Sequence, residues 1–157
     1  MNIKTIEKNE LHKALDLVWK VFKEFEAPDY TKEGIDEFKR FIEYSDIKRK
    51  VESKEFLLFG YYIDNNLVGV LGFENRPHIS LLFVDMEYQR RGAARALLSE
   101  FAGFCKENFT DNKEITVNSS PYAHDIYGKL GFKDNGDENL VNGIRFFPMK
   151  FNLEANQ

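Results

Sequence analysis

Two short segments of the chain combine residue types that can bind phosphates and move protons. The first, Gln89 to Ala94 with the sequence QRRGAA, lies between an apolar segment and a helical pattern. The first amides of a helix have no partner within it and the helix dipole makes that end positive, so an anion is stabilised there. Gly92 lets a phosphate approach the backbone, and Arg90 and Arg91 add positive charge. The segment predicts a pyrophosphate site, and the alternative is a surface turn with solvated arginines.

The second segment, Asn118 to Phe132, contains a tyrosine on one face of a short predicted helix. Ala123, Tyr127 and Leu130 stand at positions i, i+4 and i+7, so their side chains share that face. A phenol held there can donate a proton to a leaving thiolate. The alternative is a tyrosine half-buried in the core.

Both segments lie among elements that predict an α/β fold with a mixed sheet. Two strands flank the turn Asp64-Asn65-Asn66, whose residue types tolerate positive φ. Apolar periodicity predicts further elements on either side of this hairpin. The expected strands are 2–6, 56–63, 67–73, 78–84, 114–118 and about 143–153, with one more near Phe132, and Pro148 indicates an edge or a bulge in the last. The expected helices run from Glu10 to a stop at Pro28, from a cap at Thr31 with Ile35 and Phe38 buried, over 92–109, and over 121–130 with Ser120 as its cap.

Composition limits the classes of protein to consider. The 157 residues form one predicted domain, 1–157, without a linker rich in Pro, Gly or Ser. The formal net charge of −4 argues against a general nucleic-acid binder. Three scattered histidines and one cysteine, Cys105, give no metal-ligand spacing and no internal disulfide. No membrane span or secretory signal is evident, so we expect a cytoplasmic protein.

Taken together, the two segments resemble the motifs of the GNAT superfamily of N-acetyltransferases. QRRGAA matches the family's Q/R-x-x-G-x-G/A acetyl-CoA motif, with Ala94 where glycine is commoner. Asn118, Ala123, Tyr127 and Leu130-Gly131-Phe132 match the second motif, N-x4-A-x3-Y-x3-G-F. The resemblance covers nearly the whole chain. It implies a GNAT fold with a mixed central sheet of six to seven strands, about four flanking helices and splayed central strands.

The resemblance also implies roles for individual residues and direct transfer of an acetyl group from acetyl-CoA to a primary amine. Tyr127 would act as general acid toward the CoA sulfur, and Asn118 would bond the pantetheine or help order the coenzyme. Backbone groups before and within the loop would bind the rest of the coenzyme. These are Leu82, Phe83 and Val84 for the pantetheine arm, and Gln89, Arg90, Arg91, Gly92, Ala93 and Ala94 for the pyrophosphate. No metal is implied, and Cys105 is expected to be an inert core thiol on the apolar face of its helix.

The group that removes the amine proton does not follow from either motif. His78 begins the central strand and has an ordinary pKa suited to the task, and Glu74 lies just across the turn; solvent is the third choice. In the family, the acceptor pocket involves the loop that here reads EAPDYT, residues 26–31. Glu26 and Asp29 would attract a cation and Tyr30 would stack on it; the alternative is a pair of solvated carboxylates. The acidic loop 134–142 either covers this pocket or is a turn.

Two other interpretations stay open. A CoA-binding sensing or assembly module without transferase activity would use the same loop, as would a nucleotide-binding protein. The acceptor would be a small-molecule or peptide amine, and neither a nucleic acid nor a membrane is expected as a partner. A homodimer through the aromatic C-terminal strand is possible in the family, whereas core packing is the ordinary use of Phe146, Phe147 and Phe151.

Overall fold

A mixed sheet of eight strands organises the part of the chain that the computed structural model describes, residues 2–154. The strands follow the order β1-β2-β3-β4-β5-β8-β6, and β7 pairs with β8. Only the β4–β5 pairing is parallel. The α/β class and the mixed sheet are confirmed, with eight strands where six to seven were expected, because two short strands form between 133 and 141. The strands are β1 Asn2–Thr5, β2 Phe56–Ile63, β3 Asn66–Glu74, β4 His78–Val84, β5 Glu114–Ser119, β6 Lys133–Asp134, β7 Asn139–Val141 and β8 Ile144–Asn152.

The helices largely follow the predicted pattern. The Thr31 hydroxyl accepts a hydrogen bond from the amide of Gly34 and so caps its helix as expected. The first predicted helix ends in a π-helical turn, η2, and a 3-10 turn, η3, that contains Pro28. One helix, α3, was not predicted. The helices are α1 Leu11–Val21, α2 Lys32–Phe41, α3 Tyr44–Glu52, α4 Ala93–Asn108 and α5 His124–Lys129, with the turns η1 Lys8–Glu10, η2 Phe22–Glu26, η3 Ala27–Asp29 and η4 Met86–Tyr88.

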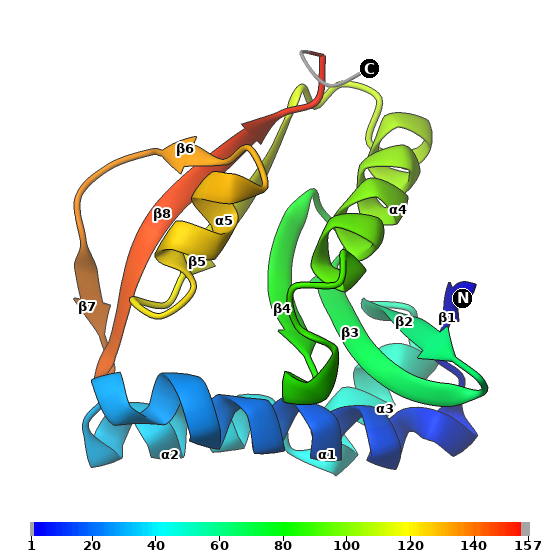
Figure 1. Cartoon of the computed structure of the whole chain (residues 1–157), viewed down its shortest axis with the longest axis horizontal. Coiled ribbons are helices and arrows are strands. Elements are labelled where there is room, and N and C mark those ends of the chain that lie inside the picture. The colour runs from blue at the N-terminus through cyan, green and yellow to red at the C-terminus, as the bar shows by residue number, and fades with distance from the viewer. Residues whose placement is uncertain (1, 155–157) are drawn as a thin grey trace.

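The sheet has a hydrophobic core on each face. Helices α1, α2 and α3 lie on one side, whereas α4 and α5 lie on the other (Figure 1). Alternate residues of β3 supply the two cores, since Val70 packs with α1 while Leu71 and Phe73 pack with α4. This period of two is the ordinary consequence of strand geometry. The central strands are therefore covered on both faces, as the nearly continuous apolar sequence of β4 predicts.

A bulge in β4 opens the sheet at its centre. Gly72 of β3 lies opposite Leu81 and Phe73 lies opposite Ile79, so Ser80 is an extra residue in β4. As a result Ile79 faces the α4 core, whereas Leu81 and Phe83 face the α1 core. A bulge bends its strand and can end pairing. The described pairing of β4 with β5 consists of His78 with Thr116 and Ile79 with Val117, after which the strands diverge (Figure 1).

The C-terminal strand β8 lies between β5 and β6 and is not the edge of the sheet. Pro148 pairs with Asn118 of β5, and its carbonyl accepts from the amide of Asn135. On that outer side the partner strand is interrupted between β6 and β7, so the missing N–H of Pro148 falls opposite the interruption. Phe151 is buried in the core and Phe147 packs on His124, with ring centres 4.6 Å apart. A homodimer through this strand stays a prediction.

Two glycines bring α2 against the turn before β8. A Cβ on Gly34 would lie 2.2 Å from the backbone oxygen of Gly143. Gly143 has a φ of +80°, and a Cβ there would lie 2.4 Å from the backbone nitrogen of Gly34. The two backbones therefore touch where larger residues would hold them apart.

Within residues 2–154, none of the helices has the length and apolar character that crossing a membrane requires.

Candidate active site

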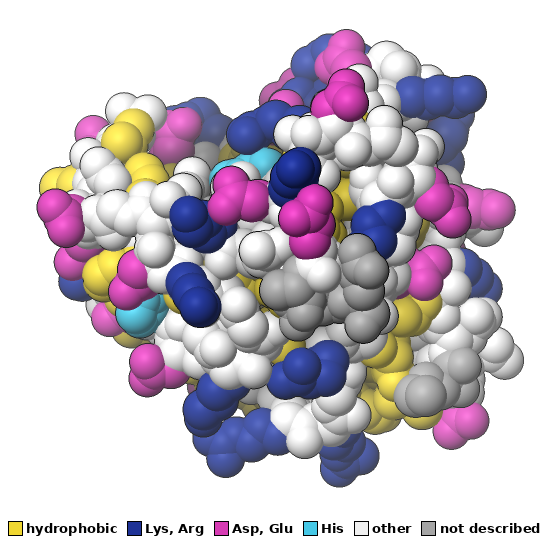
Figure 2. Space-filling model, turned by 90° about the horizontal axis from the view of Figure 1, so that it is seen from above, with side chains coloured by type: hydrophobic (Ala, Val, Ile, Leu, Met, Phe, Trp, Pro, Cys, Tyr) yellow, Lys and Arg dark blue, Asp and Glu magenta, His cyan; other side chains and the backbone are white. Residues whose placement is uncertain are grey.

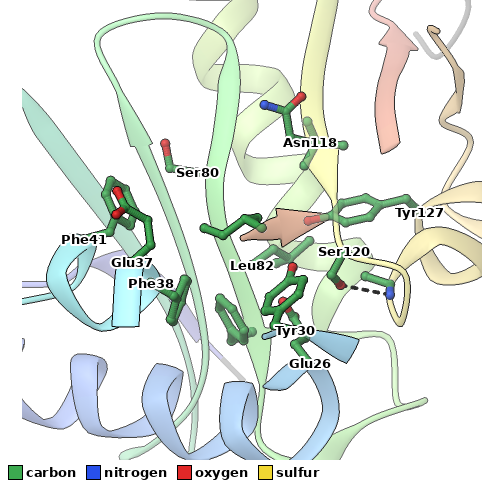
Figure 3. A pocket seen from close by; sticks show the side chains of 14 residues that line it. Glu26, Tyr30, Glu37, Phe38, Phe41, Ser80, Leu82, Asn118, Ser120 and Tyr127 are labelled. Atoms are coloured by element: carbon green, nitrogen blue, oxygen red, sulfur yellow. Dashed lines mark hydrogen bonds between the residues drawn. The ribbon is translucent and has the colours of Figure 1, made fainter. Parts of the chain in front are cut away.

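The divergence of β4 from β5 leaves a cavity of about 270 Å³ between the two strands. Its walls come from β4, β5, α2, α5 and the segment that links α1 to α2 (Figure 3). Several aromatic rings and two carboxylates line this cavity, and among the described residues no lysine, arginine or histidine lines it. The lining residues are Glu26, Tyr30, Glu37, Phe38, Phe41, Ser80, Leu82, Phe83, Val117, Asn118, Ser120, Ala123, Tyr127 and Ile144.

The predicted pyrophosphate loop leads directly into α4. Gly92 has a φ of +85°, which favours glycine, and a Cβ there would meet nothing within 4 Å. The open space in front of the helix N-terminus therefore fits a phosphate group. Arg90 and Arg91 are exposed, whereas Ala93 is buried and anchors the first turn. The role of this loop as a pyrophosphate site stays a prediction.

Side chains hold this loop against the open side of β4. Gln89 Nε2 donates to the carbonyl of Val84 at 3.0 Å, and Gln89 Oε1 accepts from the hydroxyl of Tyr122 at 3.4 Å. One of the Val84 groups expected to bond pantetheine is therefore already engaged. Leu82 and Phe83 line the cavity, while Val84 does not. The binding roles of these backbone groups stay predictions.

Asn118 and Tyr127 approach the cavity from β5 and α5, as the second motif predicts. Asn118 lies next to the end of β5 on an exposed position that lines the cavity. Tyr127 is buried, with its hydroxyl directed into the gap between the strands (Figure 3). Burial, and secondarily the charge of Glu26, raise the pKa of this phenol above its ordinary value. The hydroxyl therefore keeps its proton at neutral pH, which is the state that a general acid needs.

Of the three residues predicted to bind the acceptor, two lie in the wall of the cavity. Glu26, the last residue of η2, and Tyr30 line the wall, whereas Asp29 is exposed beside them. The side chain of Glu26 shares the cavity wall with Ser120, whose hydroxyl oxygen accepts from the amide of Ala123 at 3.1 Å. Burial raises the pKa of Glu26 to about 7, and Asp29 adds to the rise while the bond from Ser120 opposes it.

The structure does not bring His78 or Glu74 to this cavity. His78 lies at the closed end of the β4–β5 pair, where Nδ1 is 2.7 Å from the hydroxyl of Thr116. Burial, and secondarily the charge of Arg76, lower its pKa to about 4. Glu74 is exposed at the end of β3. As a general base, either residue would have to act from outside the cavity that Asn118 and Tyr127 line.

Several lining residues had no role assigned from the sequence. Ser120 is predicted as a helix cap and does accept from the amide of Ala123, but its place beside Glu26 in the cavity wall depends on packing between distant segments. Phe25 stacks on Tyr122 with ring centres 4.9 Å apart, which fixes η2 against the segment after β5. Glu37 lines the cavity from α2 and also binds Arg40 at 2.6 Å. A carboxylate on a polar helix face carries no sequence signal for such a position.

The surface seen from above mixes charges of both signs. Figure 2 shows lysines and arginines interspersed with aspartates and glutamates over most of this face, with basic side chains along its lower edge. This face therefore presents no broad basic surface of the kind that binds nucleic acids. The expectation that no nucleic acid is a partner stays a prediction.

Comparisons with known proteins place this geometry in a family. The family model described as an acetyltransferase (GNAT) domain matches residues 26–153. A UPF0039 protein of Schizosaccharomyces pombe is 29% identical over 75 residues, which are 48% of this chain and 50% of that protein. The matched stretch thus spans about half the length of that curated relative.

Solved structures share the fold at low sequence identity. The PaiA N-acetyltransferase of Thermoplasma acidophilum, in complex with coenzyme A, superposes with a TM-score of 0.77 at 18% identity, covering 97% of this chain and 99% of that one. The GCN5-related N-acetyltransferase of Rhodopseudomonas palustris gives 0.76 at 15%, covering 96% and 94%. A chimeric spermidine N-acetyltransferase built on the Vibrio cholerae enzyme gives 0.66 at 17%, covering 99% and 98%. With a family match over most of its length, a split central sheet and both motifs at that split, the chain belongs to the GNAT acetyltransferase family.

Proposed function

We propose that the protein moves an acetyl group directly from acetyl-CoA to a primary amine in a ternary complex. The observation that carries the proposal is the position of Asn118 and Tyr127 in the gap beside β4, while Gln89 of the predicted pyrophosphate loop bonds to Val84 of the same strand. Similar structures were solved with coenzyme A, and one acts on spermidine, an amine. The acetyl donor is a substrate here, and the open space before α4 and the unpaired side of β4 fit its phosphate and pantetheine parts.

Each of the residues around the gap would then have a separate role in the reaction. The first amides of α4 hold the pyrophosphate, and backbone N–H groups of β4 polarise the thioester oxygen. Asn118 orders the pantetheine from the opposite strand. A neutral amine attacks the thioester carbon, and as the carbon–sulfur bond breaks, the phenol of Tyr127 gives its proton to the sulfur. No acyl-enzyme is required, and Cys105 is fully buried in the α4 core and apart from the gap.

Release of free thiol from acetyl-CoA tests the proposal. We expect turnover with at least one member of a panel of primary amines that includes a diamine and an arylalkylamine. Replacing Tyr127 by Phe should lower kcat by roughly 10²–10⁴-fold, the range of general-acid effects, with coenzyme affinity retained. Tyr44→Phe is the matched control, because Tyr44 stacks on His12 in a different part of the molecule.

The outcomes separate the open alternatives. Calorimetric binding of coenzyme A without thiol release on any amine would favour a sensing or assembly module. Stronger binding of ATP than of coenzyme A would favour a nucleotide-binding protein. An unchanged kcat in the Tyr127→Phe variant would remove Tyr127 from the mechanism.

A further inference from the structure

One half-buried carboxyl group lines the gap and has no catalytic role assigned to it so far. Glu26 stands at the end of the π-helical turn η2, an irregularity that recurs at functional sites. Its side chain lies beside Tyr30 and Ser120 and below Tyr127 in the gap (Figure 3). The hydroxyl oxygen of Ser120 accepts from the amide of Ala123, and this hydroxyl lowers the pKa of Glu26 in opposition to burial.

The surroundings of Glu26 are neutral or acidic on every side. Asp29 and Tyr30 face it from η3 and the residue after it, and Tyr122 and Tyr127 face it from the α5 side. The nearest described cations act on these neighbours: Arg145 on Tyr30, and Arg90 on Tyr122. The other carboxylate of the cavity, Glu37, already pairs with Arg40. A desolvated carboxylate without a cationic partner is unfavourable, so the gap is suited to receive a cation from a ligand.

We infer that Glu26 binds the protonated acceptor amine and is the general base that removes its proton before transfer. This inference rests on the proposed function. It names the general base, which the proposed function leaves unassigned. An ammonium N–H bond breaks and an O–H bond forms on Glu26, which leaves the nitrogen lone pair free to attack the thioester. After attack the phenol of Tyr127 gives its proton to the departing sulfur, and the second proton lost by the nitrogen restores that phenol, so one proton passes from Glu26 to water per turnover.

The position of Glu26 favours it over the two bases suggested by the sequence. Glu26 shares the cavity with Tyr127, whereas His78 bonds Thr116 at the closed end of the strand pair. Glu74 is exposed beyond that end. The aromatic rings of Tyr30, Phe38 and Phe41 surround the same space, so the favoured acceptor is a primary ammonium on an apolar or second cationic group.

The pH dependence of kcat/KM tests this role, with the amine that the wild-type protein acetylates best. If Glu26 is the base, wild-type kcat/KM rises to a plateau above about pH 7. Glu26→Gln keeps the shape of the side chain but cannot accept the proton, so only the neutral fraction of the amine reacts. For that variant kcat/KM should fall by roughly 10²–10³-fold at pH 7 and climb roughly tenfold per pH unit toward the amine pKa. Glu24→Gln is the control, because Glu24 is exposed in the same turn.

A stability measurement tests the environment of Glu26 without any acceptor. The pKa of Glu26 is raised on folding, so the folded protein holds this proton more tightly than the unfolded chain. The unfolding free energy of the wild type should therefore decline as pH rises from about 4.5 to above 7, relative to Glu26→Gln. A parallel pH dependence of the two proteins would contradict the buried, uncompensated carboxyl group.

The results distinguish failure of this inference from failure of the proposed function. Wild-type protein that releases no thiol with any amine refutes the transferase. A wild-type transferase whose Glu26→Gln variant keeps the plateau and the rate at pH 7 refutes Glu26 as base and leaves the transferase intact. Coenzyme A binding by the variant, measured by calorimetry, confirms that it is folded and that the donor site is preserved.

Discussion

The contact between Gly34 and Gly143 offers a direct test of how the wall of the active-site gap is held. Helix α2 carries Glu37, Phe38 and Phe41 into the cavity, and Gly34 fixes the start of that helix against the turn before β8. Replacing Gly34 by Ala puts a methyl group 2.2 Å from the oxygen and 2.7 Å from the carbon of the Gly143 carbonyl. Both obstacles are backbone atoms, so α2 or the turn must move.

Two opposed contributions set the change in unfolding free energy that Gly34→Ala should cause. Overpacking destabilises a protein by typically 1–3 kcal/mol. Alanine in place of glycine within a helix returns about 0.5–1 kcal/mol. Because the clash involves backbone on both sides, the first term dominates and we expect a net loss of about 1–2 kcal/mol. For a chain of this size that corresponds to a Tm lowered by roughly 2–8 °C.

Thermal unfolding of Gly34→Ala and Gly103→Ala makes the comparison. Gly103 is in α4, and a Cβ at this position would have no atom within 4 Å. Its replacement by Ala should therefore keep Tm or raise it slightly. In the Gly34 variant the acceptor KM should also rise, since three wall residues shift, while coenzyme A affinity is retained. Equal Tm values for the two variants would refute the close backbone contact between α2 and the β8 turn.

Three further predictions concern single residues. Gly92→Val forces a β-branched residue into positive φ and fills the open space before α4, so the Kd for coenzyme A in calorimetry should rise by at least roughly tenfold. The pKa of His78 is lowered from 6.5 to about 4, so only the unfolded chain takes up this proton readily. The unfolding free energy should therefore fall as pH drops from 6.5 toward 4, and His78→Asn should flatten that part of the profile in urea titrations. Burial raises the pKa of the Cys105 thiol to about 12, so iodoacetamide at pH 8 should label native protein at least roughly 100-fold more slowly than urea-unfolded protein, as mass spectrometry would show.

Local chemistry explains which elements could be predicted. Thr31 caps α2 by a bond within three residues, and Asp64 and Asn65 adopt the positive φ that their turn requires. The loop before α4 and the face shared by Ala123 and Tyr127 also depend on spacing along the chain alone. Helix α3 was missed because Ile47 is its one fully buried side chain, so its sequence gives little apolar periodicity.

Contacts between distant segments explain what could not be predicted. The bulge at Ser80 is set by the match between β3 and β4, and it decides where β4 leaves β5. The burial of Glu26 depends on η2 packing against the segment after β5, through Phe25 on Tyr122. Read from its neighbours in the sequence alone, Glu26 is one acidic residue among several. For the same reason the sequence could not indicate that His78 lies at the closed end of the β4–β5 pair and outside the cavity.

The bulge at Ser80 has a mechanical consequence. Beyond Ile79 the described strands β4 and β5 share no ladder, so backbone pairing joins the two halves of the sheet at one end only. A donor lying along the unpaired edge of β4 and touching β5 would connect the two strands where they form no backbone pairs. Binding of the donor would then make the protein more rigid. The same binding would align the groups needed for transfer.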